Sequence, residues 1–237
     1  AWLGIAIVII LWFPTMVLMY LLTVPFDKGR YVIGWWFRRL GVAMAKVNPY
    51  WRFRRTGLRV ADPRRPYVVV SNHESFADIL LISHLPFEMK WLSKVEILGI
   101  PLIGWMMRMA GDIPIKRGFG PSAVEAMERC RASLRNRVSV IFFPEGTRSV
   151  DGNMLPFKDG AFRLAIEAGV PILPLAVAGT RTALPKHDWR FNPARAVVEV
   201  LPPIETAGLT LEDLPQLKER VRATIQAARD ALRAQLA

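Results

Sequence analysis

An imidazole and a carboxylate lie five residues apart in the segment Val68-Val-Val-Ser-Asn-His-Glu-Ser-Phe-Ala-Asp78. On a regular helix five residues rotate a side chain by roughly 140°, so His73 and Asp78 would not share a face if both were helical. They can meet if His73 lies in a turn between a strand and a helix, and Asn72 and Ser75 suit such a turn. Asp78 would then orient the ring and leave its other nitrogen to take a proton, which is the role of a histidine general base.

A second polar segment follows another apolar run, in Val140-Ile-Phe-Phe-Pro-Glu-Gly-Thr-Arg-Ser149. Gly146 lets backbone N–H groups approach a ligand closely, Thr147 and Ser149 supply hydroxyls, and Arg148 can bind a phosphate with two hydrogen bonds. The pattern favours an anion site, and a surface turn with a salt bridge is the alternative. Because open α/β sheets bind ligands beyond the carboxyl ends of their strands, we expect both segments at one edge.

The elements that would position these side chains alternate along the chain after about residue 60. Short apolar runs predict buried strands at 67–71, 89–93, 112–115, 138–143, 172–177 and 196–201. Longer runs between them predict helices at 76–84, 95–110, 122–135 and 160–168, and a final helix begins near a Thr210/Asp213 capping box. We read the basic side chains of this last helix as a solvated face: Lys218, Arg220, Arg222 and Arg229. The alternation predicts an α/β fold with a mostly parallel central sheet flanked by helices.

Composition points to an anionic partner and to lipid. The 237 residues carry a formal charge of +12, which suits nucleic acid, a phospholipid surface or a phosphate-bearing substrate. Charge alone does not choose among these, but 52% hydrophobic residues favour lipid contact. The single cysteine, Cys130, excludes an internal disulfide and every zinc site built from several cysteines, and we expect it to pack inside a helix.

The chain begins with an apolar segment that has no charged residue before Asp27. Its length permits a membrane span, whereas Pro14 permits a kink that returns the helix to the side it entered from. The next segment, 28–48, mixes tryptophans with arginines like a helix in the headgroup region, and a collar of arginines follows. We therefore predict a two-helix membrane anchor at 1–50 and a catalytic domain at 51–237 that faces the cytoplasm. A buried hairpin within the domain is the alternative.

Together these blocks resemble the glycerolipid acyltransferases, specifically the bacterial 1-acyl-sn-glycerol-3-phosphate acyltransferases. Four blocks appear in that family's order: Asn72 to Asp78, Gly111 to Arg117, Phe143 to Ser149, and Val170 to Leu175. The resemblance covers roughly residues 65–180, and the apolar start also resembles the family's anchor. The second block departs from the family pattern because Pro114 lies within it, which leaves open whether Lys116 shares the role of Arg117.

The resemblance implies roles for individual side chains. His73 would deprotonate the acceptor hydroxyl, Asp78 would hold the imidazole, and Lys94 would stabilise the negative charge that forms on the thioester oxygen. Arginines would bind the phosphate, and the glutamate with its glycine would position the glycerol part. The expected substrate-binding residues are Arg117, Glu145, Gly146, Thr147, Arg148 and Lys158.

The implied reaction transfers a fatty acyl group from acyl-ACP or acyl-CoA to the sn-2 hydroxyl of 1-acyl-sn-glycerol-3-phosphate and gives phosphatidic acid. No metal, no cofactor and no covalent acyl-enzyme is expected. Besides these substrates, the partners would be membrane phospholipid, not nucleic acid, at the cytoplasmic face of a cell inner membrane. One alternative is an acyltransferase of the same fold that uses glycerol-3-phosphate or a lyso-ornithine lipid. The other is a non-catalytic basic protein that binds a membrane surface or nucleic acid by charge.

Overall fold

A seven-stranded mixed sheet organises the computed structural model, which describes residues 1–116, 118–149, 152–185 and 188–236. The strand order is β1-β7-β6-β2-β5-β3-β4. The bounds are β1 Trp51–Gly57, β2 Val68–Ser71, β3 Met89–Lys94, β4 Ile113–Ile115, β5 Ser139–Phe142, β6 Ile172–Ala178 and β7 Ala194–Val200. Strands β4, β3, β5, β2 and β6 are mutually parallel, whereas β7 runs antiparallel to β6 and β1 is parallel to β7. The prediction of a mostly parallel sheet flanked by helices is confirmed.

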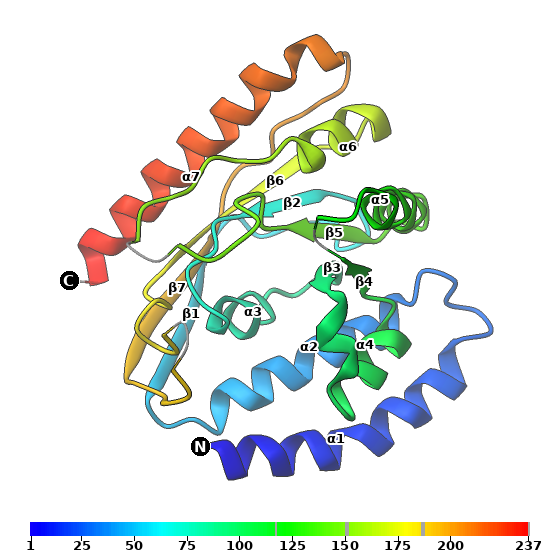
Figure 1. The fold of residues 1–237 in the computed structure, drawn as a ribbon, viewed down its shortest axis with the longest axis vertical. Coiled ribbons are helices and arrows are strands. Elements are labelled where there is room, and N and C mark those ends of the chain that lie inside the picture. The colour runs from blue at the N-terminus through cyan, green and yellow to red at the C-terminus, as the bar shows by residue number, and fades with distance from the viewer. Residues whose placement is uncertain (117, 150–151, 186–187, 237) are drawn as a thin grey trace.

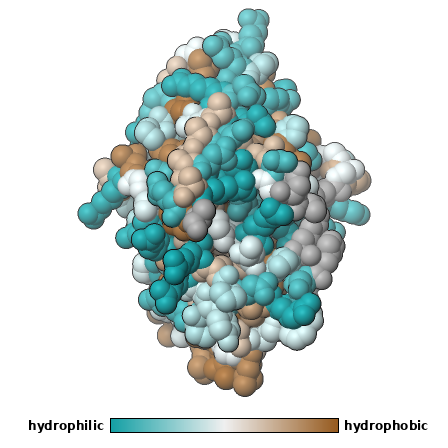
Figure 2. Space-filling view, turned by 90° about the vertical axis from the view of Figure 1, so that its left-hand side faces the viewer, coloured by the Kyte–Doolittle hydropathy of each residue, from teal (hydrophilic) through white to brown (hydrophobic). Residues whose placement is uncertain are grey.

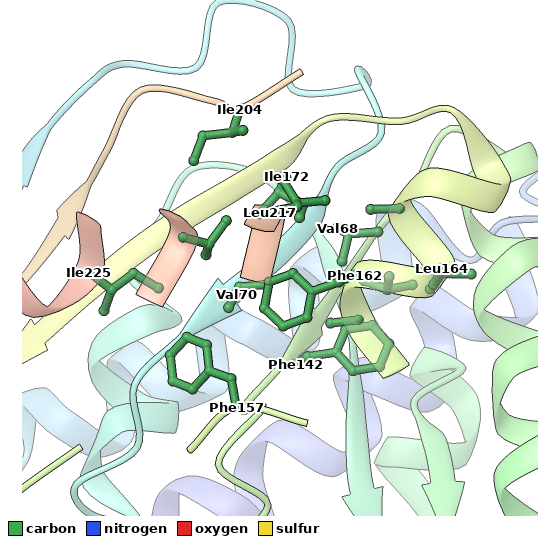
Figure 3. Packing of buried hydrophobic residues seen from close by; sticks show 14 of the residues in the cluster. Val68, Val70, Phe142, Phe157, Phe162, Leu164, Ile172, Ile204, Leu217 and Ile225 are labelled. Atoms are coloured by element: carbon green, nitrogen blue, oxygen red, sulfur yellow. The ribbon is translucent and has the colours of Figure 1, made fainter. Parts of the chain in front are cut away.

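Helices cover both faces of the sheet (Figure 1). One face packs against α5 (Gly120–Arg135), α6 (Gly160–Ala168) and α7 (Leu214–Leu236), and the other against α3 (Ala77–Ile82). Figure 3 shows the first layer, where Leu217 and Ile225 of α7 approach the β2 and β6 side chains around Phe162. Cys130 of α5 is buried in the same layer, and burial raises the pKa of its thiol to about 12, as expected for a packing residue.

The two N-terminal helices are α1 (Trp2–Thr23) and α2 (Tyr31–Lys46). Helix α1 runs without interruption through Pro14, and the chain reverses between the two helices and not at Pro14. One side of α1 packs on α2 and α4 (Ile103–Ala110) around Met16, with the Trp12 and Trp36 rings stacked at 4.7 Å. Its other side leaves apolar residues exposed, and Figure 2 shows apolar surface gathered at the base of the molecule, where Figure 1 places α1.

Helix α2, which we expected to lie in the lipid headgroup region, is attached to the sheet by buried ion pairs. Arg38, expected among the basic residues of that segment, is buried and pairs with Asp112 and with Glu88, the latter at 3.3 Å. Lys90 completes this cluster, donating to Glu88 at 3.0 Å and to the Ala110 carbonyl at 2.7 Å. Buried charges are tolerated only when they are paired and hydrogen-bonded, so this network fixes α2 against β3 and β4.

Two other local predictions need correction. The residues 51–57, read as part of a basic collar, form β1, an edge strand whose exposed arginines fit the charged side chains that protect sheet edges. The helix expected at 95–110 is split into a 3₁₀ turn, η1 (Val95–Gly99), and α4 (Ile103–Ala110), because Pro101 cannot continue the helical hydrogen bonds and Leu102 has a positive φ.

The final helix keeps the Thr210/Asp213 capping box at the 3₁₀ turn η2 (Leu211–Asp213) that precedes it, but its basic face is not simply solvated. Arg229 is buried, and Arg222 and Arg229 donate to backbone carbonyls of the loop that follows β5. Spacing along a helix could not reveal this, because the loop that accepts these bonds lies about 70 residues earlier in the chain.

Candidate active site

His73 and Asp78 meet in the turn between β2 and α3, as predicted. Nδ1 of His73 lies 2.7 Å from Oδ2 of Asp78, and Asp78 belongs to the first turn of α3. The His73 side chain is 14% exposed, whereas that of Asp78 is fully buried. This geometry engages Nδ1 and leaves Nε2 as the ring nitrogen that can exchange a proton with a substrate.

The turn keeps its shape because Asn72 continues the sheet with its side chain. The amide Nδ2 of Asn72 donates to the Val177 carbonyl at 2.9 Å, and its Oδ1 accepts from the Val177 N–H at 2.8 Å. These two bonds replace strand pairing between β2 and β6 at the point where β2 ends. The backbone is thereby free to turn while Asn72 stays attached to β6, and His73 follows directly.

Asp78 is the acceptor around which the turn closes. Its Oδ2 accepts from the backbone N–H groups of Glu74 at 2.7 Å and Ser75 at 2.9 Å, in addition to the imidazole. Its Oδ1 accepts from the hydroxyl of Thr180, a fully buried residue just after β6. Four donors therefore fix one carboxylate, which both closes the helix start and orients the His73 ring.

The loop after β5 lies against the same turn. The His73 backbone N–H donates to Oε1 of Glu145 at 2.8 Å, and the Leu155 N–H donates to Oε2 at 2.8 Å. Burial raises the pKa of Glu145, while the two backbone bonds act in the opposite direction. Phe143 stacks on the His73 ring with centroids 4.1 Å apart. Glu145 thus connects the two sequence segments that we expected to share one sheet edge.

Gly146 and Lys158 are close neighbours in this loop. Gly146 has φ +73°, a backbone conformation that favours glycine, and a Cβ atom there would lie 2.7 Å from Nζ of Lys158. Thr147 and Lys158 are exposed and Arg148 is half-buried. A glycine beside two cationic side chains and a hydroxyl suits an anionic ligand.

Two further basic residues named from the sequence, Lys94 and Lys116, are exposed. Lys94 is the exposed last residue of β3, at the same edge of the sheet as His73 and Glu145. Arg117 lies outside the described residues, so its predicted role stays a prediction. Lys116 is exposed beside the ring of Phe119.

Sequence reasoning missed Thr180 and Arg233. Arg233 donates to Glu74 at 2.5 Å and to the Gly152 carbonyl at 2.9 Å. Thr180 could have been suspected because it follows a predicted buried strand that neighbours the histidine strand. Nothing in the spacing of Arg233 relates it to residue 74.

An apolar pocket of about 100 Å³ begins beside this edge. Phe76, Ser93 and Ile97 line the part near the active-site turn, since they follow or end β2 and β3. The pocket continues between α2, α3 and α4, where Trp91 and Met107 line it together with the buried ion pair of Arg38 and Asp112.

Comparison with known proteins places this geometry in a family. The sequence model of the family named Acyltransferase matches residues 52–178, more than half of the chain. The 1-acyl-sn-glycerol-3-phosphate acyltransferase alpha of Homo sapiens is 43% identical over 197 residues, which cover 82% of this chain and 70% of that protein. This chain belongs to the acyltransferase family.

Two further relatives extend the comparison. A 1-acyl-sn-glycerol-3-phosphate acyltransferase of Chlamydomonas reinhardtii is 36% identical over 200 residues, which cover 82% of this chain but 60% of the algal protein. The crystal structure of the 1-acyl-sn-glycerophosphate (LPA) acyltransferase from Thermotoga maritima matches with a TM-score of 0.67 and 28% identity. That match covers 82% of this chain and 76% of the other.

Replacing Thr180 tests the part of the site that the sequence did not reveal. Thr180→Val removes the donor to Oδ1 of Asp78 at nearly constant volume, and a lost hydrogen bond to a charged group costs about 1.5–3 kcal/mol. We expect kcat for acyl transfer to fall about tenfold or more with little change in KM, because the carboxylate that orients His73 is less fixed.

Thr180→Ser keeps the hydroxyl and serves as the matched control, with kcat close to that of the unaltered protein. Steady-state kinetics of the three proteins provide the measurement. A serine variant as impaired as the valine variant would show that the methyl group matters, not the hydrogen bond.

Proposed function

We propose that this protein transfers a fatty acyl group from an acyl thioester to the sn-2 hydroxyl of 1-acyl-sn-glycerol-3-phosphate and so forms phosphatidic acid. The observation that carries the proposal is the 2.7 Å contact between His73 Nδ1 and Asp78 Oδ2 at the edge of the sheet, beside an apolar pocket. A base oriented in this way needs an alcohol to deprotonate, and the pocket suits the hydrocarbon chain of a lipid substrate.

The reaction proceeds within a complex of both substrates. Nε2 of His73 removes the proton from the acceptor hydroxyl as its oxygen attacks the thioester carbonyl carbon. The C–S bond of the resulting tetrahedral intermediate breaks, and the leaving thiolate takes the proton back from His73. Asp78 stabilises the imidazolium in between, and neither a covalent acyl-enzyme nor a cofactor is required.

Positive side chains around the edge would handle the negative charges of this reaction. Lys94, at the end of β3, is the proposed donor to the carbonyl oxygen as it becomes negative, a type of contact that is typically worth about 3 kcal/mol. Arg148 and Lys158 beside Gly146, together with Arg117, are the proposed phosphate ligands. Glu145, Gly146 and Thr147 would position the glycerol part. This charge supports a phosphate-bearing acceptor over a lyso-ornithine lipid.

The apolar pocket is the proposed site of the acyl chain. It extends from the active-site edge along β3 to the buried Arg38–Asp112 pair, which lies beside Trp91 and Met107. An ion pair fixed by other hydrogen bonds would give the pocket a polar limit that a hydrocarbon chain does not pass. The acyl group is delivered as an acyl-ACP or acyl-CoA thioester. The acidic carrier protein or the phosphates of coenzyme A would be attracted to this protein, which has a formal charge of +12.

The base of the molecule is the proposed membrane-contact surface. Among the described residues, α1 is the helix long and apolar enough to cross a bilayer, with a mean hydropathy of 2.5. Both of its ends contact the rest of the protein. The Trp2 indole donates to the Trp189 carbonyl at 2.8 Å, and near the other end the Tyr20 ring lies 5.7 Å from the guanidinium of Arg30. A helix attached along its length in this way would lie in one leaflet, with its exposed side in the lipid.

This arrangement supports membrane association and the proposed division into a membrane-associated segment at 1–50 and a catalytic domain at 51–237. The exposed apolar residues of α1 lie on the side away from α2: Leu3, Ile7, Ile10, Leu11, Leu18, Leu21 and Leu22. The basic residues that follow favour the cytoplasmic face of a cell inner membrane, where anionic lipid would attract them. The acceptor would then be reached from the leaflet in which it is dissolved.

The names of the relatives support the choice of acceptor. Proteins from Homo sapiens and Mus musculus that are 43% and 40% identical to this chain are named 1-acyl-sn-glycerol-3-phosphate acyltransferases, as is the Chlamydomonas reinhardtii relative. The chain spans 60% of the length of the algal protein. The acceptor is therefore best tested directly.

The proposed function is tested with the purified full chain in anionic lipid vesicles and labelled acyl-ACP or acyl-CoA. We expect the highest turnover on 1-acyl-sn-glycerol-3-phosphate, less on glycerol-3-phosphate and least on a lyso-ornithine lipid. His73→Ala should lower kcat by about 10²–10⁴-fold, the usual contribution of a general base. His84→Ala is the matched control. The described hydrogen bonds of the His84 ring go to backbone carbonyls of α3, away from the proposed reaction.

Equal or better turnover on the phosphate-free acceptor would overturn the choice of substrate. Full activity of His73→Ala would overturn the mechanism itself.

Filling the deep part of the pocket tests the position of the acyl chain. Met107→Trp adds volume beside the Arg38–Asp112 pair and should move the preference toward shorter acyl thioesters, with kcat on the shortest accepted chain nearly unchanged. Competition among thioesters of different length, analysed by mass spectrometry of the product, measures the change. An unaltered chain-length profile would place the acyl chain elsewhere.

Charged residues on the exposed side of α1 test the membrane surface. Leu11 and Leu18 are 68% and 57% exposed, so replacing both with glutamate should leave the fold intact while lowering vesicle binding at least tenfold, because charge in the apolar region costs about 2.5–3.5 kcal/mol per residue. Flotation with anionic vesicles measures the loss. Leu211→Glu, at an exposed leucine of η2, controls for added charge, and equal binding by all three proteins would contradict the proposal.

A further inference from the structure

Glu74, the residue after the proposed base, carries a carboxylate that the reaction does not use. Its side chain is 4% exposed and lies close enough to Asp78 for the two charges to interact. Burial raises the pKa of Glu74, the charge of Asp78 raises it further, and Arg233 acts in the opposite direction. A buried carboxylate in this position needs a cationic partner, because an unpaired buried charge is strongly destabilising.

That cation comes from the far end of the chain. Nη2 of Arg233, in the last turn of α7, lies 2.5 Å from Oε1 of Glu74 and 2.9 Å from the carbonyl oxygen of Gly152. Arg229, one helical turn earlier, also donates to the Gly152 carbonyl at 3.3 Å. One guanidinium therefore joins the turn that carries His73 to the loop that carries the proposed phosphate ligands.

We propose that Arg233 is a positioning residue that fixes the phosphate-binding loop relative to the catalytic turn through Glu74 and Gly152. Two other hydrogen bonds among the described residues join the same segments, from the His73 N–H to Glu145 and from the Ser149 N–H to the His73 carbonyl at 3.2 Å. Both involve the backbone of His73 itself. Arg233 adds a third connection from α7, beyond the residues 52–178 that match the family. The proposal rests on the proposed function, since it concerns the relative position of the base and the acceptor phosphate.

The test compares Arg233→Met, Glu74→Met and the double variant, with Arg220→Met as the matched control from the exposed face of α7. Arg233→Met leaves a buried carboxylate unpaired, so kcat/KM for the lyso-acceptor should fall about tenfold or more, mainly through a higher KM for the acceptor, with the KM of the acyl thioester nearly unchanged. Glu74→Met should cost about threefold, because Arg233 can still bind Gly152 and remains partly solvated.

The double variant gives the decisive result. It should be more active than Arg233→Met alone, because removing both partners leaves no unpaired charge. The inference would be overturned if the two single losses in kcat/KM multiply in the double variant. It would also be overturned if kcat/KM of Arg233→Met lies within twofold of that of the unaltered protein. A purely structural role of α7 would change stability and the kinetic constants of both substrates alike.

Hydrogen–deuterium exchange provides a readout that does not depend on activity. In Arg233→Met, exchange should rise in peptides covering residues 72–76 and 144–158, whereas Arg220→Met should leave both unchanged. If exchange rises in Arg233→Met but the unaltered protein transfers no acyl group, the proposed function is rejected and the connection through Arg233 is kept. Unchanged exchange would reject the connection even if acyl transfer is confirmed.

Discussion

The carboxylate of Asp78 is the group on which the rest of the site depends. It is buried, it lies in the first turn of α3, and it accepts from an imidazole, two backbone N–H groups and the hydroxyl of Thr180. These donors come from the turn after β2 and from the second residue after β6, so the carboxylate joins two neighbouring strands at their carboxyl ends. Without it the turn would lose its closure, and the His73 ring beside the pocket and the basic loop would lose its orientation.

Two further buried carboxylates, those of Glu74 and Glu145, lie near Asp78, and their burial lowers the stability of the fold. The pKa values of Glu74 and Glu145 are both raised, with burial as the main cause. A carboxyl group whose pKa is raised in the folded state destabilises the fold where it is ionised, so these two groups cost stability at neutral pH and cost less as the pH falls. Each is offset by specific donors, Glu145 by two backbone N–H groups and Glu74 by Arg233. Such local conflicts are usual at functional sites.

Much of this arrangement could be predicted from the sequence because its signals are local. The buried runs that became β2, β5 and β6 and the polar residues after them predict the sheet and the contact of His73 with Asp78. What failed depends on distant parts of the chain. Arg38 looked like a headgroup residue because its partners, Glu88 and Asp112, lie 50 and 74 residues away. Arg233 and Thr180 were missed for the same reason, and β1 was missed because its arginines conceal the pattern of a strand.

The reversal of strand direction between β6 and β7 has a further effect on how the molecule is joined together. Since β7 returns antiparallel to β6, the connection between them stays at the active-site edge. Near its start it contacts the catalytic turn, with Thr180 on Asp78 and the Leu184 carbonyl accepting from Ser75 at 2.9 Å. Near its end Trp189 and Phe191 contact Trp2 at the beginning of α1. The apolar helix α1 and the turn that holds the imidazole therefore both contact the segment between β6 and β7, which sets the position of one relative to the other.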